Sequence, residues 1–105
     1  MSTPTKKLTA SERREKERAE NEKKIQNANE ILKQIAEAAG IPRNVRREIR
    51  SSLDLLNDRT LGLGVRAANA VSSLEELGRN PSISSTYRVA VWSAISILES
   101  VRDTG

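Results

Sequence analysis

Apolar residues recur at intervals of three and four positions from Ile25 to Val101, a spacing typical of helices that bury one face. Glycine and proline interrupt this pattern at Gly40 and Pro42, around Gly62, and between Gly78 and Pro81. No alternating pattern of a β-strand competes with it. Because the connections are short, we expect an all-α fold, an antiparallel four-helix bundle with an N-terminally extended, charged first helix.

Each predicted helix carries a single apolar stripe. The first helix continues to about residue 39, the second spans about 42–57, the third begins near residue 65, and Ser84 or Ser85 caps the fourth. The predicted stripes are, in order, Ile25, Ala28, Leu32, Ile35 and Ala39; Val45, Ile49, Leu53 and Leu56; Val65, Ala67, Ala70, Val71, Leu74 and Leu77; and Tyr87, Val91, Ala94, Ile95, Leu98 and Val101.

The first 24 residues differ from the rest in having almost no apolar side chains. We therefore divide the chain into a charged N-terminal arm, residues 1–24, and a helical bundle domain, residues 25–105. Thr9 and Glu12 have the spacing of a capping box, which predicts that the first helix starts at Thr9. A ladder of opposite charges, four residues apart, is expected to hold this helix without a core, each step contributing about 0.3 kcal/mol. Its members are Glu12, Lys16, Glu20 and Lys24.

The chain contains no cysteine and no histidine. Disulfides, thiolate nucleophiles, imidazole bases and the usual zinc ligand sets are therefore excluded. Glu75 and Glu76 are adjacent and point in different directions on a helix, and Gly62-Leu63-Gly64 lacks the further glycine of a nucleotide-binding loop. We expect no enzyme and no cofactor. Without an apolar run long enough to span a bilayer, or a signal peptide, a cytoplasmic protein that contacts no membrane is expected.

Four arginines on the second helix are the most informative feature for function. Arg43, Arg46, Arg47 and Arg50 stand at i, i+3, i+4 and i+7, and their mean direction lies about 115° from the apolar stripe. Their guanidinium groups repel one another near a helix N-terminus, so something acidic should neutralise them. Two interpretations stay open: contact with phosphates of a nucleic acid, or ion pairs with carboxylates of the same chain.

Further basic residues lie in the arm and at two helix starts. Lys6, Lys7, Arg13 and Arg14 are candidate phosphate contacts if the arm orders on a partner, although glutamates interleaved with them also fit a solvated helix. Arg66 and Arg88 are single residues that we expect to form structural ion pairs or to cap a preceding turn. The pairs Val45-Arg46, Val65-Arg66 and Tyr87-Arg88 recur about every twenty residues and hint at a weak internal repeat.

Tyr87 and Trp92 are the only aromatic residues of the chain, and both lie in the fourth predicted helix. Stacking of single-stranded RNA bases requires exposed rings, whereas this helix is rich in core positions. We therefore expect both rings to pack in the core. If nucleic acid is the partner, recognition should rest on backbone and shape, with little readout of bases.

Three collinear motifs resemble a family of small uncharacterised archaeal proteins: Ile41-Pro42-Arg43-Asn44-Val45-Arg46-Arg47, Val65-Arg66-Ala67-Ala68-Asn69-Ala70-Val71, and Tyr87-Arg88-Val89-Ala90-Val91-Trp92 followed by Leu98-Glu99. The resemblance covers about residues 31–101. It implies a compact helical bundle without known enzymatic activity, in an archaeal cytosol. The charged arm before Ile25 is a departure, because the family pattern is expected largely to lack it.

The net charge of +4 lies within the first sixty residues, since residues 61–105 carry four basic and four acidic side chains. A small basic bundle with a protruding arm is typical of a peripheral ribosomal subunit. We expect an accessory protein of a ribonucleoprotein particle, the ribosome foremost, that contacts structured RNA and neighbouring ribosomal proteins. The alternative is a non-enzymatic protein–protein interaction module, for example a homodimer, in which the arginines form internal ion pairs.

Overall fold

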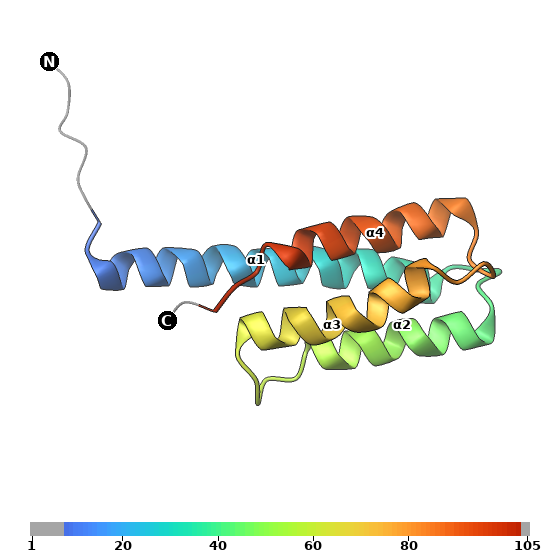
Figure 1. Ribbon diagram of the computed structural model, residues 1–105, viewed down its shortest axis with the longest axis horizontal. Coiled ribbons are helices and arrows are strands. Elements are labelled where there is room, and N and C mark those ends of the chain that lie inside the picture. The colour runs from blue at the N-terminus through green and yellow to red at the C-terminus, as the bar shows by residue number, and fades with distance from the viewer. Residues whose placement is uncertain (1–7, 104–105) are drawn as a thin grey trace, which may run out of the picture.

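A computed structural model describes residues 8–103, which form four helices and no strand. Helix α1 spans Ala10–Glu37, α2 spans Arg43–Leu56, α3 spans Leu63–Gly78 and α4 spans Ser85–Glu99. Short loops reverse the chain between them, and α1 extends well beyond the other three helices (Figure 1). The predicted all-α bundle with an extended first helix is confirmed.

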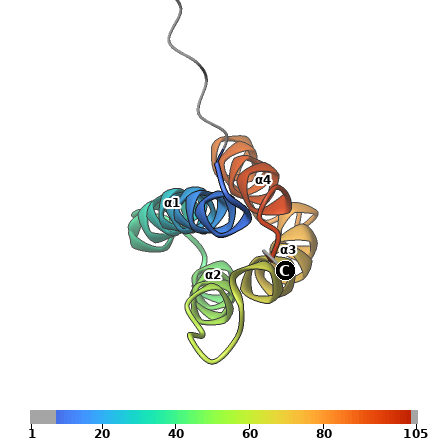
Figure 2. The same ribbon diagram turned by 90° about the vertical axis from the view of Figure 1, so that its left-hand side faces the viewer.

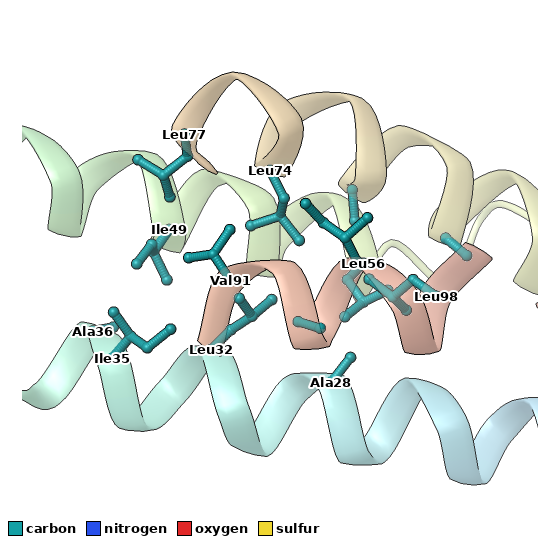
Figure 3. Close-up of a cluster of buried hydrophobic side chains, with 14 of the residues drawn as sticks. Ala28, Leu32, Ile35, Ala36, Ile49, Leu56, Leu74, Leu77, Val91 and Leu98 are labelled. Carbon is teal, nitrogen blue, oxygen red and sulfur yellow. The ribbon is translucent and has the colours of Figure 1, made fainter. Parts of the chain in front are cut away.

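The helices surround one apolar core. Each packs against its neighbours in the chain, and α4 returns to pack against α1, so that the end-on view in Figure 2 shows them around a common axis. Leucine, isoleucine, valine and alanine side chains from all four helices meet in the middle (Figure 3). The side chains with no exposed surface include Ala28, Leu32, Val45, Ile49, Leu56, Ala70, Leu74, Val91 and Ala94.

Three residues expected in the core lie at the surface. Ala39 is exposed because α1 ends at Glu37, and Ala36 is buried in its place. The side chain of Val65 is 43% exposed, because it lies two positions from the buried Ala67 and so points to the opposite side of α3. Leu63 packs partly against the core in its place. Tyr87 also packs against the core as expected, but Trp92 is 38% exposed and covers Gly78 at the edge of α3.

Gly40 and Gly78 end their helices in different ways. Gly40 has φ +84°, a left-handed conformation that follows the end of α1 and that glycine adopts without strain. Gly78 is the last residue of α3 and is helical. Its missing side chain matters for packing instead, since a Cβ there would lie 2.8 Å from Cε2 of Trp92.

Helix α1 begins with the predicted capping box. The backbone N–H of Glu12 donates to Oγ1 of Thr9 at 3.1 Å, and the N–H of Thr9 donates to the Glu12 carboxylate at 3.4 Å. From Ala10 to Glu20 the helix buries no residue. The predicted ladder from Glu12 to Lys24 has no nitrogen–oxygen distance within 4.0 Å, so the start of the arm depends on its cap and on continuity with the packed part of α1.

The first buried residue of α1 is Asn21, four residues before the predicted boundary at Ile25. Asn21 is buried, and its Nδ2 donates to the carbonyl oxygen of Arg102 at 2.7 Å. The next residue, Asp103, accepts a hydrogen bond from the N–H of Gly64 at 2.7 Å. The C-terminal segment therefore ties the middle of α1 to the N-terminus of α3.

An arginine from each of the last three helices binds backbone carbonyls at or just after the end of the preceding helix. In α2, Arg46 donates from Nε to the carbonyl of Ala36 at 2.8 Å and from Nη2 to that of Ala38 at 3.1 Å. In α3, Arg66 donates from Nε to the carbonyl of Leu56 at 2.8 Å. These carbonyls have no partner within their own helix and carry its negative partial charge, which favours a cation.

Arg88 makes the third of these contacts. Its Nη2 donates to the carbonyls of Asn80 at 3.1 Å and Ile83 at 3.3 Å, in the turn that follows α3. Arg46, Arg66 and Arg88 each occupy the fourth position of their helix, so the short repeat of an apolar residue and arginine has a common structural role. The expectation that Arg66 and Arg88 cap a preceding turn is confirmed.

Replacing Arg46 by Met should destabilise the fold more than the same change at Arg47. Met keeps an unbranched stem and a similar helix propensity but removes the two charge-assisted hydrogen bonds. We expect Arg46→Met to lower the free energy of unfolding by about 1–2 kcal/mol, discounted for partial exposure. Arg47→Met, at an exposed position, should change it by less than about 0.5 kcal/mol. Chemical denaturation measures the free energy of unfolding of both variants. Equal losses of stability would contradict the structural role of Arg46.

Thr9→Ala should affect the arm and leave the bundle intact. Loss of the cap costs about 1 kcal/mol of local helix stability, because the first-turn N–H groups lose their side-chain acceptor. Backbone amides of residues 12–18 should exchange with solvent severalfold faster by NMR. The global free energy of unfolding should stay within about 0.5 kcal/mol of the wild type, because these residues bury no apolar surface. A global loss as large as the local one would show that the arm packs on the bundle.

Candidate nucleic-acid interface

The solvent face of α2 carries Arg43, Arg47 and Arg50, and all three side chains are exposed. At 100° per residue they point roughly 155° away from the buried stripe formed by Val45, Ile49, Ser52 and Leu56. Burial of that stripe turns the three guanidinium groups outward. We call Arg43, Arg47 and Arg50 the arginine face.

No carboxylate of the described chain neutralises the arginine face. Between residues 8 and 103 the one ion pair within 4.0 Å joins Arg79 Nη2 to Glu75 Oε2 at 3.7 Å, on α3. Glu48 and Asp54 lie on α2 itself but form no ion pair within that distance. The interpretation that these arginines form internal ion pairs therefore finds no support among the described residues.

Arg46 does not belong to the arginine face. It lies roughly 90° from the buried stripe, on the side from which its guanidinium reaches the end of α1, and it is half-buried there. The sequence pattern groups Arg46 with the other three arginines, because the angle of 100° per residue does not reveal how close a side chain lies to the preceding helix. Its Nε and Nη2 are committed to the fold, so the candidate interface on α2 depends on the other three arginines.

The N-terminus of α2 adds to the positive character of this face. Its N-cap is Pro42, no side chain accepts a hydrogen bond from the first turn, and that turn contains no acidic residue. Unpaired N–H groups and the positive end of the helix dipole both favour an anion at this position. Arg43, the first residue of the helix, stands beside it.

The arm contributes less charge than its basic residues suggest. Arg13 and Arg14 are exposed in the first two turns of α1, but Ala10–Glu20 contains four basic and four acidic side chains. Lys6 and Lys7, the other predicted contacts, lie outside the described residues. Within the described part of the arm, Arg13 and Arg14 are adjacent to each other and distant in sequence from the arginine face.

Two other classes of site receive no support from the described residues. No group of three or more carboxylate, imidazole or thiolate side chains among them could hold a metal ion. None of the four helices is long and apolar enough to cross a membrane.

One surface feature has no precedent in the sequence patterns. An open groove of about 640 Å³ lies between the start of α3 and the end of α4. Gly64 and Ala68 line it, and Val65 stands exposed at its edge. A Cβ on Gly64 would lie 2.7 Å from the backbone nitrogen of Asp103, so this glycine allows the C-terminal segment to approach α3.

Comparison with known proteins places the chain among archaeal relatives. The UPF0147 model, described as an uncharacterised protein family, matches residues 12–101. A UPF0147 protein of Aeropyrum pernix is 46% identical over 85 residues, covering 81% of this chain and 93% of that protein. One from Metallosphaera sedula is 38% identical over 84 residues, covering 80% and 94%.

A crystal structure of a protein of unknown function, MMP1188, has the same fold. It matches with a TM-score of 0.72 at 26% identity, over 93% of this chain and 99% of that one. The family match begins at Glu12, so the expectation that the family largely lacks the arm was wrong. Residues 12–24 of the arm belong to the same helix as the packed part of α1. This continuity is a physical reason why the family model includes both. The chain belongs to the UPF0147 family.

Proposed function

We propose that this protein is a small basic subunit of a ribonucleoprotein particle, the ribosome foremost, and that the arginine face binds RNA phosphates. The observation that carries the proposal is the outward row of three guanidinium groups without a carboxylate partner in the described chain. Such a role requires no catalytic group and no cofactor, and it places the protein in the cytoplasm with the ribosomes.

The geometry of the arginine face suits a phosphate backbone. The planar guanidinium donates two parallel hydrogen bonds to phosphate oxygens, and three such groups within two helical turns can contact successive phosphates. The uncapped N-terminus of α2 provides further donors beside Arg43. A convex helix of this kind can lie along a groove of structured RNA, with neighbouring ribosomal proteins contacting other faces of the bundle.

The aromatic residues argue for recognition of the RNA backbone over its bases. Tyr87 packs against the core, and Trp92 on α4 lies over Gly78 of α3, whereas the arginine face is on α2. Neither ring accompanies the arginines to stack a base. Arg13 and Arg14 on the arm provide a second, more distant contact with RNA. This contact would fix the orientation of the protein on the RNA.

Sedimentation of an archaeal lysate through a density gradient tests the proposal directly. The protein should migrate with ribosomal particles at moderate salt and leave them as salt rises, because phosphate binding releases condensed counterions. Migration only at the top of the gradient at every salt concentration would contradict the proposal.

Loss of the arginine face should weaken association with RNA without unfolding the bundle. The triple variant Arg43→Gln, Arg47→Gln, Arg50→Gln should weaken binding to purified ribosomal RNA at least about tenfold. It should also reduce the slope of log K against log salt by roughly 2, or 0.7–0.9 per lost phosphate contact. The matched control removes equal charge elsewhere, at Lys23, Lys24 and Arg59, and should change affinity by less than about threefold. Equal effects of the two variants would show that net charge alone drives binding.

A further inference from the structure

The arginine face of α2 is followed on the same side of the helix by a carboxylate. Asp54 is exposed, and at 100° per residue its side chain points within about 20° of the mean direction of Arg43, Arg47 and Arg50. These four residues follow one another along the helix axis in steps of about 4.5–6 Å, at 1.5 Å per residue. We call them the α2 row. It consists of three cations followed by one anion.

The described fold gives the Asp54 carboxylate no structural role. Asp54 lies in the last turn of α2, where the negative end of the helix dipole disfavours an acid. Among residues 8–103 its side chain has no hydrogen bond and no ion pair within 4.0 Å, although Arg50 lies one turn earlier. Asp58 differs, because it accepts hydrogen bonds from the N–H and Oγ1 of Thr60. Both carboxylate oxygens of Asp54 are therefore available as acceptors beside the arginine face.

The side of the α2 row nearest α1 is occupied by side chains that bind within the bundle. Arg46 donates to carbonyls at the end of α1, and Asn57 exchanges two hydrogen bonds with Asn29 of α1. A nucleic acid that lies against α2 therefore meets the α2 row itself. Three of its members donate hydrogen bonds, and Asp54 can only accept them.

A carboxylate beside bound phosphates repels them unless it meets a hydrogen-bond donor of the nucleic acid. The ribose 2′-hydroxyl is a donor that RNA carries on every nucleotide and that DNA lacks. In A-form RNA the 2′-hydroxyls line the wide, shallow minor groove, whereas side chains cannot read the deep, narrow major groove. A short aspartate side chain suits a ribose close to the helix, while the longer arginines reach phosphates at the edge of the groove.

We propose that α2 lies in the minor groove of A-form RNA, where the Asp54 carboxylate accepts a hydrogen bond from a ribose 2′-hydroxyl and the arginine face binds adjacent phosphates. The proposal rests on the proposed binding of RNA and makes Asp54 the residue that distinguishes RNA from DNA. The hydroxyl donates to a charged acceptor, which gives a short and comparatively strong hydrogen bond. Because every nucleotide has this hydroxyl, the contact selects RNA without selecting a sequence.

Two short duplexes of the same sequence test the proposal, one of unmodified RNA and one of RNA with 2′-fluoro riboses. Both are A-form with the same phosphates and bases, but the fluorinated duplex has no 2′-hydroxyl donor. By fluorescence anisotropy at fixed salt, the full chain should bind unmodified RNA about tenfold more tightly, as expected for one charge-assisted hydrogen bond.

Asp54→Ala should bind the two duplexes equally, within about twofold. It should also bind the fluorinated duplex more tightly than the wild type does, because a carboxylate that repels phosphates is gone. Alanine at this exposed position favours the helix, so circular dichroism should show unchanged helicity. Glu48→Ala is the matched control: it removes the same charge from an exposed position of α2 about 135° from the arginine face, and it should keep the tenfold preference.

The possible results separate this proposal from the RNA-binding function on which it rests. Equal binding of both duplexes by the wild type would overturn the contact with a 2′-hydroxyl, as would a preference that persists in Asp54→Ala. Binding to purified ribosomal RNA without binding to the unmodified duplex would overturn the placement of α2 in the minor groove. Absence of binding to both would instead contradict the proposed function itself.

Discussion

Each helix of this chain has one apolar stripe, and the core closes only when all four stripes turn inward together. Burial of Leu32, Ile49, Leu74 and Leu98 therefore sets the rotation of every helix about its axis. The outward direction of the arginine face follows from the burial of Val45 and Ile49 on the same helix. The proposed RNA-binding surface is thus what remains after the core is satisfied.

Arginines of similar sequence context have two separate roles in this fold. None of the helices has a basic residue in its last turn, and α1, α2 and α3 are each followed by a helix whose fourth residue is an arginine that bonds back to the connection. These arginines replace a cap that the helices do not provide for themselves. Arg43, Arg47 and Arg50 face solvent instead, because the rotation that buries Val45 turns them away from every neighbouring helix. One turn of α2 contains both kinds.

Local patterns predicted what depends on local geometry. Spacing along the chain predicts the capping box of Thr9 and Glu12, the stripe of α2 and that of α1 except for Ala39. It also predicts the turn at Gly40 and the outward direction of Arg43, Arg47 and Arg50. Features that depend on distances between helices were predicted wrongly or were not predicted. The pattern groups Arg46 with its neighbours, it gives the end of α3 at Gly78 correctly but not the contact of Gly78 with Trp92, and it has no signature for the groove beside Ala68. Val65 was an error of helical phase, since the buried Ala67 already excluded it from the core.

The division of the arginines into structural and ligand-binding groups is the central claim, and NMR of the arginine Nε–H groups tests it most directly. In the free protein the Nε–H groups of Arg46 and Arg66 should exchange slowly with water, because each donates to a carbonyl at 2.8 Å. Those of Arg43, Arg47 and Arg50 should exchange rapidly, then shift and become protected when ribosomal RNA is added, while Arg46 and Arg66 stay unchanged. Exchange at Arg46 as rapid as at Arg47, or RNA that perturbs none of the three, would contradict the account.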